Sequence, residues 1–133
     1  MIGVVVAAHG HLAEELLRTA EGVVGPLAQS RAVSVAVNGD PRLPLREAIE
    51  AVDQGDGVLL LTDLMGGSPT NLCLSFLAER NVEVVTGVNL PMLIKLGPLR
   101  QKGSPVIELA RELCAVGQKA IVDATDLVRS RRP

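Results

Sequence analysis

The stretch that decides the fold is Ile2-Gly3-Val4-Val5-Val6-Ala7-Ala8-His9-Gly10, an apolar run that ends on a histidine and a glycine. A continuous, valine-rich run of this length is typical of a strand that is buried on both faces of a parallel sheet. After Gly10 the sequence changes to a helical pattern, so the strand turns directly into a helix. His9 therefore stands at the edge of a sheet where α/β proteins place their ligands.

A second junction of the same kind lies further along the chain. Val58-Leu59-Leu60-Leu61-Thr62 leads into Asp63 and then into Gly66-Gly67-Ser68-Pro69, which marks the start of another helix. In an open α/β sheet the carboxyl ends of the strands border one crevice. We therefore expect His9 and Asp63 to face each other.

Apolar runs of strand length alternate with helical stretches along the whole chain. This alternation predicts an α/β fold, with an open, mostly parallel sheet flanked by helices and joined by right-handed crossovers. At 133 residues the chain has room for one domain, over residues 1–133, with a polar tail from about residue 124. The predicted strands are Ile2 to Ala8, Arg31 to Val37, Val58 to Thr62, Glu83 to Thr86 and a last short one around Ala120 to Val122.

Each predicted helix carries an apolar stripe. In the first, which ends near Gly25, Glu14 and Arg18 have the spacing of an ion pair. Ser68 is expected to cap the third helix, ahead of Pro69, and a short fourth helix is expected to start at Pro91. A fifth follows the cap-then-proline pair Ser104-Pro105. The expected buried residues are Ala13, Leu16, Leu17, Ala20 and Val24; Leu45, Ala48, Ile49 and Val52; Leu72, Cys73, Phe76 and Leu77; and Val106, Leu109, Ala110 and Leu113.

Composition excludes several classes of function. The net charge is −2 and Phe76 is the single aromatic residue, so the chain has neither the basic surface nor the stacking groups of a nucleic-acid-binding protein. The first apolar run is too short to cross a bilayer and has no charged leader, so no membrane insertion is expected. Cys73 and Cys114 are isolated among apolar neighbours, which predicts buried free thiols in a cytoplasmic, unprocessed protein.

The sequence lacks the motifs of nucleotide-binding proteins, serine hydrolases and zinc proteins. The sequence has no G-x-x-x-x-G-K-[ST] loop and no G-x-G-x-x-G fingerprint, which disfavours nucleotide chemistry. The turn before Pro69 differs from the nucleophile elbow of a serine hydrolase. A zinc site made of His9, His11 and Asp63 is disfavoured because these residues do not clearly complete a ligand shell. We therefore expect neither a metal nor a cofactor, and His11 to be a solvated residue of the first turn.

The residues around His9 are suited to binding a phosphoryl group. Gly10 lets the chain turn tightly into a helix whose first N–H groups point toward an incoming anion, and the Gly66-Gly67-Ser68 turn offers a second set of donors. Asp63 can accept a hydrogen bond from one ring nitrogen of His9 and leave the other nitrogen as a nucleophile. Each piece also has a structural interpretation: a hydrogen-bonded histidine, a well-capped turn, or an aspartate that caps the backbone.

Three blocks of sequence together point to a known family. They are Val6-Ala7-Ala8-His9-Gly10 followed by Leu12-Ala13-Glu14, then Thr62-Asp63-Leu64-Met65-Gly66-Gly67-Ser68-Pro69-Thr70-Asn71, and then Gly87-Val88-Asn89-Leu90-Pro91-Met92-Leu93. In order and spacing they resemble the enzyme IIA domain of the mannose-type (mannose/fructose/sorbose) sugar phosphotransferase system, over nearly the whole chain.

The resemblance implies that His9 is a transient phosphoryl carrier, which accepts the group from the phosphohistidine of HPr and passes it to an enzyme IIB protein. It implies that Asp63 orients His9 through the proximal ring nitrogen and that Asn89 to Met92 line the same crevice. Family members are commonly homodimers that exchange a C-terminal strand, so residues 120–122 are expected to pair with a second copy. The residues implied to hold the phosphoryl group are Gly10, Gly66, Gly67 and Ser68.

Two alternatives stay open. The sequence contains no enzyme IIB domain, so the acceptor is expected to be a separate protein or to be absent. A carrier of this kind can instead act as a regulatory module that binds a partner according to its own phosphorylation state. The phosphotransfer subunit of dihydroxyacetone kinase shares the fold and the N-terminal histidine, although the Gly66-Gly67-Ser68-Pro69-Thr70-Asn71 turn favours the mannose type.

Overall fold

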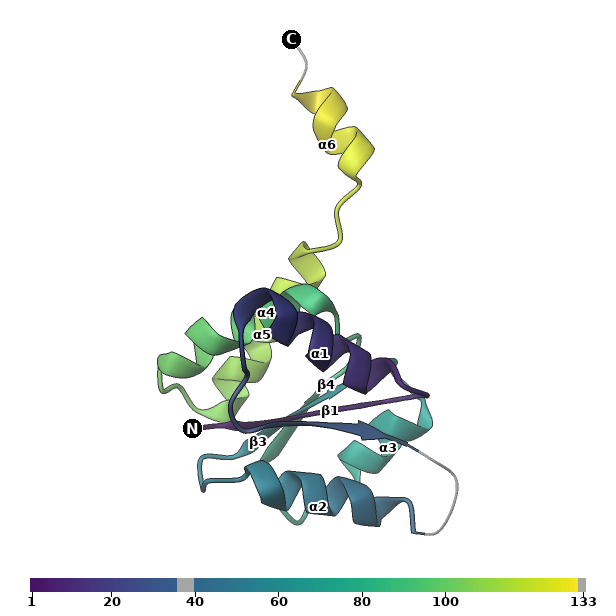
Figure 1. The fold of residues 1–133 in the computed structure, drawn as a ribbon, viewed down its shortest axis with the longest axis vertical. Coiled ribbons are helices and arrows are strands. Elements are labelled where there is room, and N and C mark those ends of the chain that lie inside the picture. Colours follow the sequence, from purple (N-terminus) through teal and green to yellow (C-terminus); the bar gives the residue numbers. More distant parts are fainter. Residues whose placement is uncertain (36–39, 132–133) are drawn as a thin grey trace.

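The computed structural model of the chain describes residues 1–35 and 40–131. Strands and helices alternate as the apolar runs predict, and Figure 1 shows the sheet with helices on both of its faces. The strands are β1 (Gly3–Ala8), β2 (Ser30–Ser34), β3 (Val58–Thr62) and β4 (Val82–Val85). The helices are α1 (Leu12–Val24), α2 (Arg42–Val52), α3 (Ser68–Leu74), α4 (Leu90–Gln101), α5 (Val106–Lys119) and α6 (Ala124–Ser130).

The four described strands form one parallel sheet in the order β2-β1-β3-β4. The chain runs from β1 outward to β2 and then returns to the other side of β1 to form β3. The strand order therefore reverses between β1 and β3, which is where open α/β sheets bind their ligands. In the register of this pair Ala7 lies opposite Thr62, so the residues that follow the two strands emerge side by side.

Two apolar clusters cover the two faces of the sheet. Helices α1, α4 and α5 pack on one face and α2 and α3 on the other, as Figure 1 shows. Strands β1 and β3 are buried along their whole length, which accounts for their unbroken apolar sequence. Arg100 is a buried charged residue that sequence reasoning did not single out. It donates from Nη1 to the carbonyl oxygen of Ile2 at 3.1 Å and so joins α4 to the start of the sheet.

Most predicted strands and helix faces are confirmed, with local corrections. The second strand, predicted over Arg31 to Val37, is Ser30–Ser34; residues 36 and 37 lie outside the described residues. Val24 and Leu77 were expected in the core, but they are 44% and 50% exposed. Arg18 pairs with Glu15 at 2.8 Å and not with Glu14, because both side chains are exposed and the i,i+3 partner is equally within reach.

The predicted helix starts need two corrections. Gly67 is the N-cap of α3, and Ser68 is the first helical residue with no side-chain capping bond. Proline in the first turn is confirmed there. The fourth helix begins at Leu90, next to the predicted Pro91, but at 12 residues it is a full-length helix, because the chain continues through Pro98. Ser104 likewise does not cap α5, whose N-cap is Pro105.

The prediction of a strand around Ala120 to Val122 is wrong for the single chain. Helix α5 continues to Lys119, and residues 121–123 form no regular element before α6. Figure 1 shows α6, in yellow, projecting away from the rest of the molecule. All residues from 120 to 131 are exposed, among them the apolar Ile121 and Val122. A strand needs a neighbour, and the segment has none among the described residues of the single chain.

The two thiols differ in burial. Cys73 is fully buried as predicted, and this burial raises the pKa of its thiol to about 12. Cys114 is only half-buried, which corrects the expectation that both are core residues. Among the described residues, no helix has both the length and the apolar character that crossing a bilayer requires.

Candidate active site

His9 and Asp63 meet at the point where the strand order reverses. His9 follows the last residue of β1 and Asp63 follows the last residue of β3, so the parallel register brings them together. The side chain of His9 is 53% exposed, whereas that of Asp63 is 8% exposed. The prediction that the two residues face each other is confirmed. An accessible imidazole thus rests against a covered carboxylate.

Both oxygens of the Asp63 carboxylate are engaged. Oδ2 lies 2.6 Å from Nδ1 of His9 and also accepts the backbone N–H of His9 at 2.9 Å. Oδ1 accepts the backbone N–H of Leu64 at 2.9 Å. The carboxylate therefore fixes the imidazole ring and the residue that carries it at the same time.

The surroundings of Asp63 favour its ionised form. Burial alone raises the pKa of the carboxyl, but the hydrogen bonds from the His9 backbone, the His9 ring and Leu64 together outweigh burial, and the pKa lies below the ordinary value of 3.8. An ionised carboxylate only accepts hydrogen bonds, so Nδ1 of His9 is the donor. In the neutral imidazole, Nε2 then carries the free lone pair.

Glycine turns shape both sides of this pair. Gly10 has φ of +55° and Gly66 has φ of +82°, a region that favours glycine over other residues. The carbonyl oxygen of Gly10 accepts a 2.6 Å hydrogen bond from Ser34 Oγ, which ties the turn to β2. A Cβ atom on Gly67 would lie 3.0 Å from Cε1 of His9. The start of α3 thus approaches the imidazole closely only because residue 67 has no side chain.

Behind the turn lies a buried pair of hydroxyls that sequence reasoning missed. Thr62 and Thr70 are both fully buried, and their Oγ1 atoms are 2.6 Å apart. Thr70 Oγ1 also donates to the carbonyl oxygen of Leu64 at 2.6 Å. Both threonines lie in the second block of family-like sequence, but nothing in that block shows that their side chains meet. Ser68 is exposed beside them.

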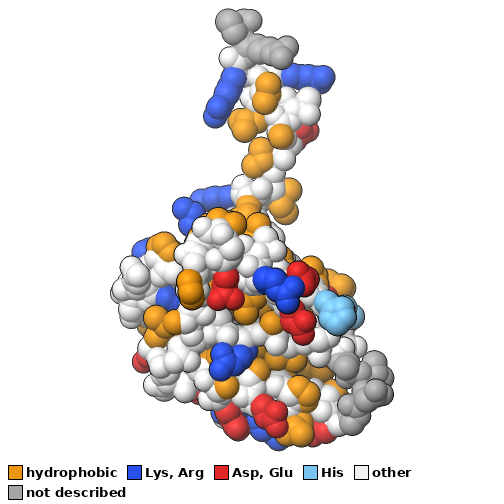
Figure 2. All heavy atoms as spheres, in the orientation of Figure 1, with side chains coloured by type: hydrophobic (Ala, Val, Ile, Leu, Met, Phe, Trp, Pro, Cys, Tyr) orange, Lys and Arg blue, Asp and Glu red, His pale blue; other side chains and the backbone are white. Residues whose placement is uncertain are grey.

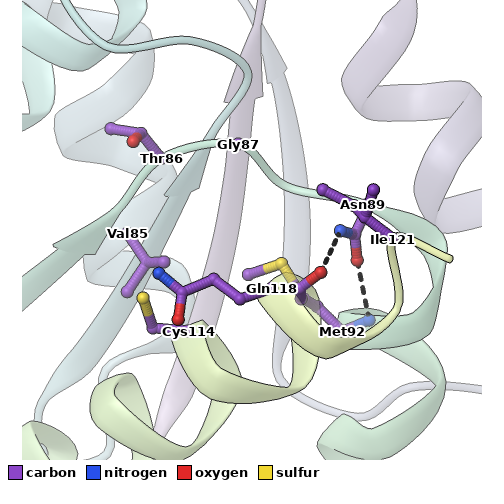
Figure 3. A pocket seen from close by; sticks show the side chains of 9 residues that line it. Val85, Thr86, Gly87, Asn89, Met92, Cys114, Gln118 and Ile121 are labelled. Carbon is purple, nitrogen blue, oxygen red and sulfur yellow. Dashed lines mark hydrogen bonds between the residues drawn. The ribbon is translucent and has the colours of Figure 1, made fainter.

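Two groups of predicted residues have partners other than His9. His11 is the N-cap of α1 and is solvated as expected, with its ring 3.7 Å from Glu14. No cluster of three metal-ligating side chains occurs in the part of the chain that the structure describes. Asn89 and Met92 were expected in the crevice of His9, but they line a separate hollow of about 260 Å³, shown in Figure 3, whose lining does not include His9.

The side chain of Asn89 is engaged at both of its ends. Its side-chain oxygen accepts the N–H of Met92 at 3.3 Å, and its Nδ2 donates to the carbonyl oxygen of Gly117 at 3.2 Å, as Figure 3 shows. Asn89 thereby caps α4 and joins it to α5. Neither of these bonds involves His9.

Large apolar side chains are exposed next to the site. Leu12, Leu64 and Met65 are 45%, 52% and 70% exposed, and they follow His9 and Asp63 within three residues in the sequence. Figure 2 shows exposed histidine surface at the edge of one face, close to both acidic and basic side chains. Exposed apolar groups beside a reactive side chain are typical of a surface that meets another protein.

Comparison with known proteins gives a consistent result. A family model described as "PTS system fructose IIA component" matches residues 3–113. The mannose-specific EIIAB component of the phosphotransferase system of Escherichia coli K12 is 32% identical over 125 residues, which are 90% of this chain and 38% of that protein. The chain thus spans well under half the length of this relative. The fructose-specific EIIA component of Bacillus subtilis is 30% identical over 107 residues, which are 76% of this chain and 72% of that protein.

Solved structures agree with the sequence relatives. The phosphotransferase system component EIIA from Streptococcus agalactiae has a TM-score of 0.83 at 25% identity, over 95% of this chain and 99% of that chain. The mannose/sorbose-specific IIA subunit from Enterococcus faecalis has a TM-score of 0.72 at 31% identity, over 91% of this chain and 92% of that chain.

Proposed function

Since the chain belongs to the family of EIIA components of the sugar phosphotransferase system, we propose that it carries a phosphoryl group on His9, between phospho-HPr and an enzyme IIB protein. The observation that supports this role is the contact between His9 Nδ1 and the buried carboxylate of Asp63 at 2.6 Å. It leaves an exposed Nε2 as the nucleophile. The protein acts in the cytoplasm, where HPr is found.

The transfer needs little covalent chemistry from the protein. The Nε2 lone pair of His9 attacks phosphorus in line, and the N–P bond to the donor histidine breaks as the new N–P bond forms. The positive charge that develops on the imidazole is balanced by Asp63 through the Nδ1–H bond. Positioning and charge stabilisation therefore supply most of the catalysis. The same geometry serves the onward transfer, in which the N–P bond to His9 breaks as a nucleophile of the enzyme IIB protein bonds to phosphorus.

The incoming phosphoryl oxygens meet the start of α3. The turn with Gly66 and Gly67 brings this helix start against the edge of the His9 ring, where the Ser68 hydroxyl and backbone N–H groups donate. Gly10 lies in the turn between His9 and α1. One well-placed donor to a developing negative charge is worth about 3 kcal/mol in enzymes. No metal is needed if these donors take its place.

The partner that delivers the phosphoryl group is a protein. Leu12, Leu64 and Met65 form an exposed apolar rim near His9, and burial of such side chains stabilises a protein interface. A small sugar would instead be held by a closed polar pocket. The rim therefore favours HPr and enzyme IIB as direct partners.

We also propose that the protein is a homodimer in which residues 120–122 of each copy pair with β4 of the other. Strand β4 lies at the edge of the described sheet, so only β3 among the described strands pairs with it. Val85 and Thr86 border an apolar hollow there. Ile121, 83% exposed, belongs to a segment with no partner strand. An exposed edge and an unpaired apolar segment stabilise each other when they pair.

The decisive experiment measures intact mass after the protein is incubated with phosphoenolpyruvate, enzyme I and HPr. We expect the unmutated chain to gain one acid-labile phosphoryl group and the His9→Ala variant to gain none. His11→Ala is the matched control, because His11 is exposed and lies two residues away, and it should be phosphorylated normally. Labelling of His9→Ala at the normal rate would overturn the proposal.

A second step distinguishes transport from regulation. The phosphorylated protein is mixed with purified mannose-type IIB protein, and the loss of phosphoryl group from His9 is followed by mass. Transfer within the time of HPr phosphorylation supports the relay. A phosphorylated form that is stable in the presence of IIB, with HPr still active, would instead favour the regulatory module.

A further inference from the structure

We propose that Thr70, held in turn by Thr62, is a positioning residue for phosphorylation of His9. The inference rests on the proposed function. Neither threonine touches the imidazole, so each acts through the turn that connects β3 to α3. This turn carries Asp63 at its start and Gly67 at its end, the two residues that border the ring of His9.

The direction of the hydrogen bonds can be deduced. The carbonyl oxygen of Leu64 only accepts, so the single hydroxyl proton of Thr70 points to it across 2.6 Å. The bond between the two threonines, also 2.6 Å, must then use the proton of Thr62. The result is a one-way chain from the Thr62 hydroxyl to the Thr70 hydroxyl and then to the Leu64 carbonyl.

The chain continues to the reactive ring. Leu64 donates its own N–H to Oδ1 of Asp63 at 2.9 Å, and Oδ2 of the same carboxylate holds Nδ1 of His9. Both backbone polar groups of Leu64 are thus engaged, one with Thr70 and the other with Asp63. The Leu64 carbonyl also accepts the N–H of Gly67, at the longer distance of 3.4 Å.

The strength of this anchor comes from its burial. Thr62 and Thr70 are both 0% exposed, whereas Leu64 is 52% exposed. Without Thr70, an exposed turn would be closed mainly by the long bond from Gly67. A buried hydroxyl that loses its partner is costly, so the pair tolerates few alternative arrangements. We infer that Thr70 limits the motion of Asp63 and therefore of the His9 ring.

The direction of donation predicts unequal effects of the two threonines. Thr70→Val removes the bond to Leu64 and leaves the Thr62 hydroxyl without an acceptor, so phosphorylation should slow roughly tenfold, less than the roughly hundredfold that a 1 Å misplacement can cause. Thr62→Val leaves the bond from Thr70 to Leu64 in place and should slow phosphorylation by less than about threefold. Thr70→Ser keeps the hydroxyl and should restore the rate.

The double variant Thr62→Val/Thr70→Val separates positioning from stability. Replacing both partners by apolar groups of the same shape is nearly neutral for folding, so its thermal midpoint should return toward that of the unmutated chain. Its phosphorylation by HPr should stay slow, because the Leu64 carbonyl is still not held. If the rate recovers together with the midpoint, or if Thr70→Val is phosphorylated normally, the proposal is wrong.

A spectroscopic measurement tests the positioning without any phosphoryl donor. Nitrogen-15 NMR of the His9 imidazole reports which ring nitrogen carries the proton. We expect one tautomer, with Nδ1 protonated, in the unmutated chain and in Thr70→Ser, and a mixture in Thr70→Val. Ser30→Ala removes a buried hydroxyl whose 3.1 Å bond goes to Ala28 at the far end of β2, and it should change nothing. If HPr phosphorylates neither the unmutated chain nor any of the variants, the proposed function fails. The tautomer measurement alone then decides whether Thr70 positions His9.

Discussion

A single carboxylate oxygen of Asp63, Oδ2, accepts two hydrogen bonds from His9: one from the ring Nδ1 at 2.6 Å and one from the backbone N–H at 2.9 Å. The two bonds close a small ring that includes the side chain of the histidine. Rotation of the imidazole would break one of them while the other persisted. Asp63 therefore holds the orientation of His9 and its tautomer together.

Asp63→Asn should slow phosphorylation of His9 by on the order of 100-fold or more, because the wrong tautomer is strongly inhibitory in comparable histidine–aspartate pairs. An amide accepts with only one of its two ends. Its NH₂ group must face either the N–H groups of His9 or the N–H of Leu64. Since all of these groups are donors, at least one of the hydrogen bonds to residue 63 is lost.

The initial rate of phosphohistidine formation measures this effect, and circular dichroism should show that Asp63→Asn remains folded. Asp53→Asn is the control, since Asp53 is exposed and its contact is with the nearby Gly55 N–H. A normal rate in Asp63→Asn would show that the carboxylate does not orient the nucleophile.

The stability of the protein should depend on pH through Asp63. Its pKa in the folded state lies below the ordinary value of 3.8, so the folded state binds this proton less tightly than the unfolded state does. The stabilisation is then fully present above about pH 5 and is lost as the pH falls through 3.8 toward the folded pKa.

Urea unfolding of the unmutated chain and of Asp63→Asn between pH 3 and pH 7 measures this contribution. The difference in free energy of unfolding between the two proteins should be constant near neutral pH and should shrink below about pH 4. A difference that stays constant down to pH 3 would mean that Asp63 titrates normally in the folded state.

The main features of the site could be predicted from sequence because they depend on the sheet. Unbroken apolar runs identify β1 and β3, and parallel strands deliver the residues that follow them to one edge. His9 and Asp63 therefore meet whatever the details of the turns. Four apolar residues at helical spacing were likewise enough to identify the buried face of α2.

The features that sequence reasoning missed depend on short-range choices or on a missing neighbour. Ser68 looks like a cap, but the chain enters α3 one residue earlier, at Gly67. The hydroxyl pair behind the turn joins β3 to α3, so it depends on how these two elements pack, which the periodicity of neither element shows. Residues 120–122 have the composition of a strand, yet a strand needs an edge to pair with.

Gly67→Ala should impair phosphorylation with little effect on folding. Gly67 has φ of −76°, which alanine adopts without strain. Its Cβ would lie 3.0 Å from Cε1 of His9 and 3.4 Å from Cγ of Leu64, so the exposed ring must shift by a few tenths of an ångström. Phosphorylation should then slow roughly tenfold.

Gly97→Ala is the matched control, because a Cβ there would meet no atom within 4 Å. It lies inside α4 and should raise the free energy of unfolding by up to about 1 kcal/mol while leaving the phosphorylation rate unchanged. Equal rates in both variants would show that the ring of His9 has more room than the structure gives it.

Ile121→Asp should convert the proposed dimer into monomers without unfolding the chain. Ile121 is 83% exposed in the single chain, so a charge there costs the isolated fold little. In the dimer the same side chain would lie against the edge of β4, where an unpaired carboxylate is strongly unfavourable. Sedimentation velocity at tens of micromolar protein measures the change.

Leu43→Asp controls for the added charge, because Leu43 is 48% exposed in the first turn of α2, away from β4. This variant should stay dimeric. A monomeric unmutated chain at that concentration would refute the exchange, and loss of the dimer in both variants would place the interface elsewhere.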